Sequence, residues 1–318
     1  MKYFNPKKAS IFVLLFCCLF IFNFKNTYAY GNGFANSRQI TIDHTKVQNT
    51  DQTDFPVLFS GTYSYLANVN NGGAVRNTSG YDIGFYTNSD CSTGKLNWEK
   101  ERYVSTTGDV SYWIKLPTVS YTDDTSFYIC YGNQSISTDQ SNKNAVWSSN
   151  YASVWHLADG TNLSATDSTL NGVNGNITDA TASSGKIDGS GNFDGVSGKI
   201  AFPGFSIPST GTISAWYKPT NAVGTSFEPI VSTRTLDGGV QAFDFYPSMG
   251  TGFSGWYKNG VDERIEFNPA AYMSAGNWYY ITMTWQDGGD TVLRINSNVV
   301  NTKHSLSTTW NTSLYTTY

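Results

Sequence analysis

Residues 193–296 consist of short apolar or aromatic runs separated by Gly, Pro, Asn or Asp. Three of these runs are Thr212–Pro219, Trp278–Gly288 and Thr291–Asn296. Alternating runs of this length, bounded by turn-forming residues, are typical of strands in antiparallel sheets. The block therefore predicts an all-β fold, built as a sandwich of packed sheets.

A second group of such runs lies in the first half of the chain and predicts a separate small all-β domain. Charged residues make up only 14% of the sequence and aromatic residues 15%, which favours strands over helices. The predicted strands are Ser37–Ile42, Phe55–Phe59, Tyr81–Tyr86, Val110–Leu116 and Ser126–Tyr131. The polar residues 134–150 are expected to link a first domain, 30–133, to a second domain, 151–318.

The N-terminus has the pattern of an export signal. A lysine-rich head precedes an unbroken apolar run, residues 11–22, which has the length of a signal peptide rather than of a full membrane span. A small-x-small cleavage pattern ends at Ala29. We expect residues 1–29 to be removed and the protein to be secreted or held at the cell surface. The alternative is an uncleaved N-terminal anchor.

The charge of the mature chain argues against two classes of partner. Cleavage after Ala29 removes four lysines and no acidic residue, which leaves 16 basic and 24 acidic residues and a net charge of −8. Nucleic acids and anionic membranes both bind through basic faces. We therefore expect neither as a partner.

Cys91 and Cys130 are the two cysteines that follow the signal segment. An isolated pair of cysteines in an oxidising compartment is a candidate disulfide. Export therefore predicts a bridge between Cys91 and Cys130. The alternative is two buried free thiols.

Four sequence pieces of the first half follow one another in order, and Tyr131-Gly-Asn133 ends the set. The pieces are Ile40–Thr45, Thr53–Val57, Tyr81–Phe85 and Val110–Pro117. In these pieces residues 37–133 resemble the bacterial family known as domain of unknown function 2341. The resemblance implies a β-sandwich module and brings no catalytic residues with it.

The second half carries another set of pieces in matching order and spacing: Val154–Leu157, Phe193–Gly195, Ile213–Pro219 and the run that starts at Trp278. Here the chain resembles a laminin G-like member of the concanavalin A-like lectin and glucanase superfamily. The resemblance implies a jelly roll of two curved antiparallel sheets. Members of the family continue beyond the position of Tyr318 with one more strand, so we expect the second domain to be incomplete and the chain to be a fragment.

The signatures of catalysis are missing from the sequence. Glucanases of this superfamily use paired carboxylates in a Glu-x-Asp-x-x-Glu strand, and the chain has no such run. The acidic cluster Asp262–Glu266 has the wrong spacing and is expected to be a solvated charge ladder. Residues Gly252–Trp256 fail the Gly-x-Ser-x-Gly pattern at the last position. The residues present therefore favour a non-catalytic protein.

Calcium is a candidate cofactor, because laminin G-like domains often bind it through carboxylates in loops. Asp194 and Asp167 are the candidate ligands, since both lie in Gly-rich turns. The alternative for each is a carboxylate that caps a tight turn through its own backbone.

A sugar site needs aromatic faces for the apolar side of a pyranose ring and polar groups for its hydroxyls. The candidate ligand-binding residues lie in polar, Gly-rich stretches of the second domain: Tyr246, Trp256, Tyr257, Asn259 and Asp262. The alternative is that these aromatic side chains fill the core, which is the location we expect for Trp216, Trp278 and Trp285.

These observations favour an exported recognition protein that binds a glycan or an extracellular protein, for adhesion or for anchoring. The first alternative is a pair of accessory modules of a secreted glycoside hydrolase or another enzyme, whose catalytic domain lies beyond Tyr318. The second alternative is a structural spacer of a surface fibre.

Overall fold

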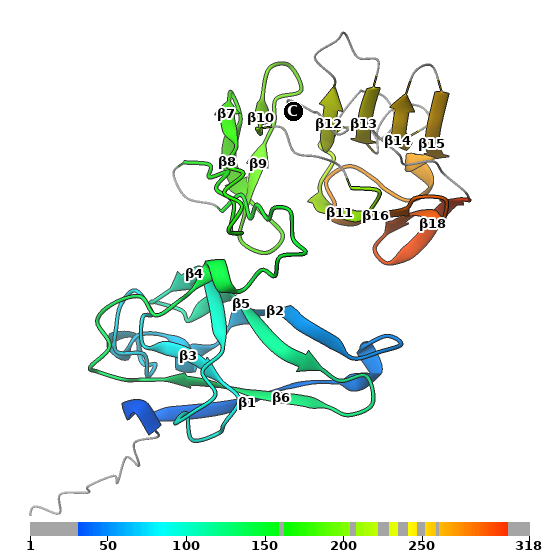
Figure 1. Cartoon of the computed structure of the whole chain (residues 1–318). Coiled ribbons are helices and arrows are strands. Elements are labelled where there is room, and N and C mark those ends of the chain that lie inside the picture. Colours follow the sequence, from blue (N-terminus) through cyan, green and yellow to red (C-terminus); the bar gives the residue numbers. More distant parts are fainter. Residues whose placement is uncertain are drawn as a thin grey trace, which may run out of the picture.

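The computed structural model describes residues 31–158, 162–203, 208–221, 229–234, 241–246, 252–258 and 261–304. Strands dominate these ranges, as predicted, and form two units (Figure 1). The predicted signal segment lies outside the described residues. No helix in these ranges is long and apolar enough to span a membrane. Their helical structure is limited to short 3-10 turns: Gly31–Gly33, His44–Lys46, Ser64–Leu66, Val69–Asn71, Lys143–Ala145 and Pro269–Ala271.

The first unit is a sandwich of two antiparallel sheets, ordered β1-β6-β3 and β2-β5-β4. The sequence predicted five of its six strands and missed β4, which has four charged residues among its eight. The strands are β1 Asn36–Ile42, β2 Gln52–Thr62, β3 Ile83–Tyr86, β4 Asn97–Val104, β5 Asp109–Val119 and β6 Thr125–Tyr131.

Phe85 on β3 lies at the centre of the core between the two sheets. Its ring centre is 5.3 Å from that of Tyr112, 5.8 Å from that of Trp98 and 6.1 Å from that of Phe59. These edge-to-face contacts are the preferred geometry of aromatic pairs. The first sandwich is therefore closed by aromatic packing.

The predicted disulfide between Cys91 and Cys130 is confirmed, with Cα atoms 6.3 Å apart. Both cysteines are fully buried and pack with Phe34 and Tyr86 in a small second cluster. The bridge ties the loop after β3 to the end of β6.

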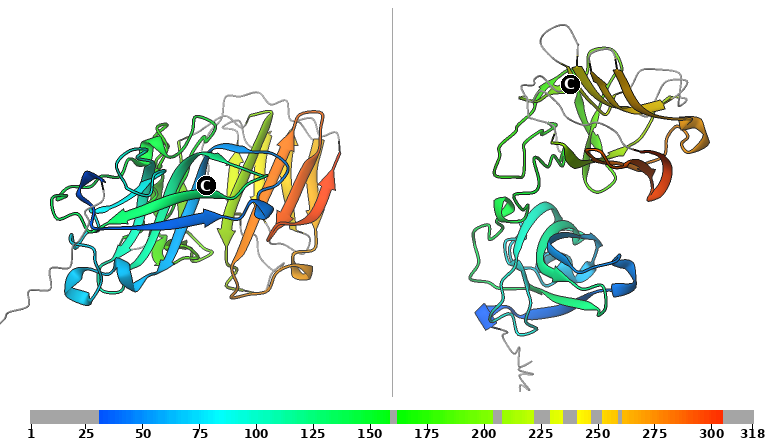
Figure 2. Two further views of the ribbon diagram at one scale, coloured as in Figure 1. Left: turned by 90° about the horizontal axis from the view of Figure 1, so that it is seen from below. Right: turned by 45° about the vertical axis from the view of Figure 1, so that its right-hand side comes forward.

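The second unit contains two four-stranded antiparallel sheets, ordered β11-β16-β17-β18 and β12-β13-β14-β15. Two small antiparallel strand pairs precede them: the hairpin of β8 and β9, and the pair of β7 and β10, which lie on either side of that hairpin in the sequence. The first sheet lies on the side nearer to the first unit (Figures 1 and 2). The strands are β7 Asn176–Thr178, β8 Thr181–Ser184, β9 Gly189–Asn192, β10 Lys199–Ala201, β11 Thr210–Tyr217, β12 Val231–Arg234, β13 Gln241–Tyr246, β14 Gly252–Lys258, β15 Val261–Phe267, β16 Tyr279–Gln286, β17 Thr291–Ile295 and β18 Asn298–Lys303.

The core of this unit lies between its two sheets. Strand β16 contributes Ile281, Met283 and Trp285, each separated by one residue, so alternate positions of the strand point inward. Phe245 on β13 and Ile265 on β15 are buried from the opposite sheet. The predicted two-sheet sandwich is confirmed, as is the core position of Trp285.

The two units meet at a buried polar cluster on β4. Glu99 accepts hydrogen bonds from three groups that follow the first sandwich in sequence: Trp147 Nε1 at 2.8 Å, Ser168 Oγ at 2.6 Å and the imidazole of His156 at 3.1 Å. These residues belong to the predicted linker and to the start of the predicted second domain. The segment that contains Trp147, His156 and Ser168 therefore packs on the first sandwich.

Glu101 is the second carboxylate of this cluster. Its Oε2 accepts a 2.7 Å hydrogen bond from Trp113 Nε1 and lies 3.5 Å from His156 Nδ1. Burial raises the pKa of Glu101, although the charges of His156 and the Trp113 hydrogen bond oppose the rise. Burial also acts on Glu99, but there the bonds and charge of His156 outweigh it and lower the pKa. A single imidazole thus serves two neighbouring carboxylates.

A further ion pair connects the units. Arg102 on β4 contacts Asp188 Oδ1 at 2.9 Å and Asp109 Oδ2 at 2.9 Å. Asp188 precedes β9, so this contact fixes the turn between β8 and β9 against the first sandwich. The division of the chain at residues 134–150 stays a prediction, but packing continues across it.

We predict that the double substitution of Cys91 and Cys130 by Ala lowers the free energy of unfolding by about 4 kcal/mol. The two cysteines are 39 positions apart. Closing a loop of that length removes conformational entropy from the unfolded chain and raises its free energy by about this amount. Chemical denaturation of the oxidised protein and the variant gives the difference. A reducing agent should destabilise the wild type alone; equal stability of the two proteins would contradict the prediction.

We predict that His156→Ala lowers the free energy of unfolding by about 3 kcal/mol, because it leaves two buried carboxylates without their cation. Burial disfavours the imidazolium, but Glu99 and Glu101 outweigh it and raise the pKa of His156. The stabilisation is therefore full below the unfolded pKa, about 6.5, and is lost as pH rises through the higher folded pKa.

Denaturation curves between pH 5 and 9 measure this effect. The matched control is His304→Ala, because His304 is 75% exposed and pairs with Asp290 at the surface. Its substitution should change stability by less than about 0.5 kcal/mol. A His156 variant that shows the same pH profile as the wild type would refute the role of the imidazolium.

Candidate ligand-binding face

The outer face of the β11-β16-β17-β18 sheet presents an aromatic pair to solvent. Trp216 on β11 is opposite Tyr280 on β16, and their ring centres are 5.3 Å apart. Their side chains are 39% and 38% exposed. The expected core position of Trp216 is therefore wrong: Ile213 and Tyr217 take the inward positions of β11, and alternation turns Trp216 outward.

Three basic side chains accompany this aromatic pair. Lys186, from the turn between β8 and β9, places Nζ 5.6 Å from the ring centre of Trp216. Lys218 directly follows β11 and places Nζ 5.9 Å from the ring centre of Trp278, which is half-buried rather than in the core. Arg294 on β17 donates to Thr284 Oγ1 at 3.3 Å. Cations at these distances interact favourably with an indole ring.

Ser and Thr side chains occupy most of the other outward positions of β11 and β16. The burial of Ile281, Met283, Leu293 and Ile295 sets which positions point inward, and the register of β11, β16 and β17 then gives the outward ones. The outward positions are occupied by Thr210, Thr212, Ser214, Trp216, Tyr280, Thr282, Thr284, Gln286, Val292 and Arg294. None of these residues carries a carboxylate.

This combination is suited to a sugar chain. Aromatic rings stack on the apolar side of a pyranose, and Ser, Thr, Gln and Arg side chains exchange hydrogen bonds with hydroxyls. Both strands of this face were predicted from the sequence, but the sequence analysis placed Trp216 of β11 in the core and so assigned the wrong side of that strand to solvent. Burial of the partner strand identifies the exposed side.

The candidate sugar-binding residues predicted from the sequence belong to the other sheet. Tyr246 ends β13, Trp256 and Tyr257 lie on β14, and Asp262 lies on β15. In the backbone register Trp256 pairs with Glu263, and Tyr257 pairs with Asp262. Their side chains and all of Asn259 lie outside the described part of the chain. Their role in binding stays a prediction.

Asp194, a candidate calcium ligand, caps a turn in the structure. Its Oδ1 accepts hydrogen bonds from the backbone N–H groups of Val196 at 2.9 Å, Ser197 at 3.0 Å and Gly198 at 2.8 Å. These bonds lower the pKa of Asp194 to about 2. The carboxylate is thus engaged with its own loop, and calcium binding there stays a prediction.

Asp167, the other candidate calcium ligand, is buried and also bonds to backbone. Its carboxylate accepts from the N–H groups of Val154 at 2.9 Å, Thr169 at 2.9 Å and Val173 at 3.0 Å. Burial acts against the charged form, but these bonds outweigh it and lower the pKa. Asp167 thereby joins the backbone at Val154 to that of residues 169–173, at the start of the second half. Its role as a calcium ligand stays a prediction.

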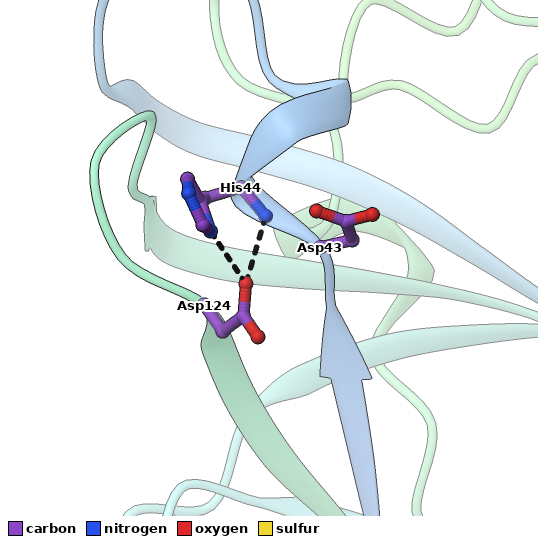
Figure 3. A group of neighbouring side chains, drawn as sticks. All are labelled: Asp43, His44 and Asp124. Atoms are coloured by element: carbon purple, nitrogen blue, oxygen red, sulfur yellow. Dashed lines mark hydrogen bonds and ion pairs between the residues drawn. The ribbon is translucent and has the colours of Figure 1, made fainter.

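A surface cluster that the sequence did not indicate joins Asp43, His44 and Asp124 (Figure 3). The imidazole Nδ1 and the backbone N–H of His44 both contact Asp124 Oδ1, at 2.7 and 3.0 Å. Asp43 accepts instead from Thr45 N and Oγ1. The Asp124 hydrogen bond raises the pKa of His44. Local hydrogen bonds account for this exposed arrangement.

Comparison with known proteins assigns part of the chain. Residues 194–317 match the family of laminin G type described as the concanavalin A-like lectin/glucanases superfamily. The second half therefore contains a concanavalin A-like domain, as its sequence pieces predicted. The match does not extend to residues 37–133, so their resemblance to domain of unknown function 2341 stays a prediction. No curated protein matches the chain.

One solved structure that aligns with the chain is domain 4 of AbnA, a GH43 extracellular arabinanase from Geobacillus stearothermophilus, in complex with arabinotriose. The alignment has 19% identity and a TM-score of 0.35, and covers 45% of this chain and 71% of that chain. A TM-score this low does not establish a shared fold.

We predict that the Asp194 carboxylate titrates with a midpoint of about 2, because Val196, Gly198 and Ser197 donate to its charged form. The stabilisation from the hydrogen bonds that Asp194 accepts is therefore fully present above the pKa of the unfolded state, about 3.9. It is lost as the pH falls through the pKa of the folded state. Carboxyl carbon resonances followed by NMR give the midpoint. A midpoint near 4 would show that the carboxylate does not cap the turn.

Proposed function

We propose that this protein is an exported, non-catalytic recognition protein whose concanavalin A-like domain binds a glycan. The observation that carries the proposal is the exposed pair of Trp216 and Tyr280, whose neighbouring outward positions on β11 and β16 are mostly Ser and Thr. Such a pair offers a sugar chain a stacking surface with hydrogen-bonding groups on the adjacent positions.

The expected export of the protein supports the proposal. The buried Cys91–Cys130 bridge is a feature of proteins that fold in oxidising compartments. Together with the signal pattern of residues 1–29, it favours export to the outside of the cell, where polysaccharides are accessible. In this role the first sandwich holds the binding domain in a fixed orientation through the cluster of Glu99, Glu101 and His156.

The β13–β15 positions are a second candidate binding region within the same function. Phe245 on β13 and Ile265 on β15 point into the core. Trp256 and Tyr257 are neighbours on β14, and neighbouring residues of a strand face opposite sides of the sheet, so one of the two aromatic side chains is expected to be exposed. Trp256 and Tyr257 therefore both remain candidates for contact with a ligand.

We predict that Trp216→Ala weakens glycan binding about tenfold, because it removes the larger ring of the stacking pair. A glycan array identifies ligands of the full chain, and titration calorimetry with one of them compares the variants. The matched control is Tyr121→Ala, which removes an aromatic ring that is 46% exposed on the first sandwich.

The control should bind as the wild type does. Loss of binding in Tyr257→Phe but not in Trp216→Ala would move the site to the other sheet. Failure of the wild type to bind any glycan would refute the proposed function.

A further inference from the structure

The charge of the outer face defines its ligand more narrowly. We propose that the face of β11, β16 and β17 binds an acidic polysaccharide, in which the sugar rings carry carboxylates. The proposal rests on the glycan-binding function above and adds the chemical class of the glycan.

The first argument is the distribution of charge. The whole chain has a net charge of −4, yet Lys186, Lys218 and Arg294 lie on one sheet face with no carboxylate on its outward positions. None of the three forms an ion pair with the described residues.

Some cations of the first sandwich pair with nearby carboxylates, whereas others, such as Arg38, Lys46 and Lys95, form no ion pair with the described residues. Lys100 pairs with Asp139 at 3.3 Å, Lys115 with Asp54 at 3.2 Å, and Arg102 with its two aspartates. The outer face differs because it groups three cations where no outward position carries a carboxylate, so these cations are available for carboxylates of a ligand.

The second argument is the position of these cations relative to the rings. Lys186 and Lys218 lie within 6 Å of the ring centres of Trp216 and Trp278. A pyranose stacked on an indole ring projects its exocyclic group beyond the edge of the ring. A carboxylate at that position comes within reach of a flexible lysine, which gives up only a weak cation–π contact to meet it.

An acidic polypeptide offers the same charges but fits the face less well. The outward row of Thr212, Ser214, Thr282 and Thr284 is suited to a ligand rich in hydroxyls, and the flat aromatic pair is suited to sugar rings. The test therefore includes an acidic polypeptide as a separate arm.

The experiment measures binding of the full chain to three polymers by affinity electrophoresis and titration calorimetry. The probes are polygalacturonate, the same polymer with its carboxylates methyl-esterified, and poly-glutamate. Esterification removes the charge and keeps the pyranose rings. We expect polygalacturonate to bind at least about tenfold more tightly than the ester or poly-glutamate, and its binding to weaken as salt shortens the screening length from about 10 Å at 0.1 M.

Variants assign the effect to the face. Lys186→Gln, Lys218→Gln and Arg294→Gln should each weaken polygalacturonate binding roughly two- to fivefold, as expected for exposed ion pairs. Lys46→Gln, an exposed cation of the first sandwich, is the matched control and should change nothing. Thermal melting confirms that each variant is folded.

The outcomes separate the two proposals. Equal binding of the acid and the ester, with loss in Trp216→Ala, overturns the acidic class and leaves the glycan function standing. Equal or tighter binding of poly-glutamate overturns the acidic polysaccharide as the occupant. Binding that is the same in the three charge variants as in Lys46→Gln overturns the assignment to this face. Absence of binding to any glycan overturns both proposals.

Discussion

The structure depends on the burial of two neighbouring carboxylates, Glu99 and Glu101, against one imidazole. Two like charges so close together in a dry interior are costly unless a cation and hydrogen-bond donors accompany them. His156 supplies the charge, while Trp147, Trp113 and Ser168 supply donors. Three of those four residues follow the first sandwich in sequence. The first sandwich is therefore complete only when the start of the second half is packed on it.

This coupling extends to the proposed binding face. Arg102, next to Glu101 on β4, binds Asp188, and Asp188 belongs to the turn that carries Lys186. Through these contacts the first sandwich helps to position the ammonium group of Lys186 above the ring of Trp216, which belongs to the second unit. The first unit thus helps to fix the turn that carries one cation of the proposed face.

Much of the fold was predictable from the sequence, because most strands alternate in the usual way and end at turn residues. Strand β4 was not predictable, because its outer face is covered by Trp147, His156 and Ser168, which follow Glu99 by 48, 57 and 69 positions. Its charged pattern therefore resembles that of a solvated segment. The face of β11 was also not predictable. Either side of that strand could be buried, and only pairing with the inward-facing Ile281 and Met283 of β16 settles the question. The disulfide was predictable, since export and a single pair of cysteines leave one arrangement.

The most direct test of the account is an NMR titration of the nine indole N–H signals with a glycan ligand. Trp285 is an internal reference, because its Nε1–H donates a 2.8 Å hydrogen bond to the carbonyl of Pro208 and its ring is buried. We predict that the signal of Trp216 shifts in proportion to the ligand bound and that the signal of Trp285 does not. Shifts confined to Trp256, with Trp216 unchanged, would contradict the assignment of the binding face.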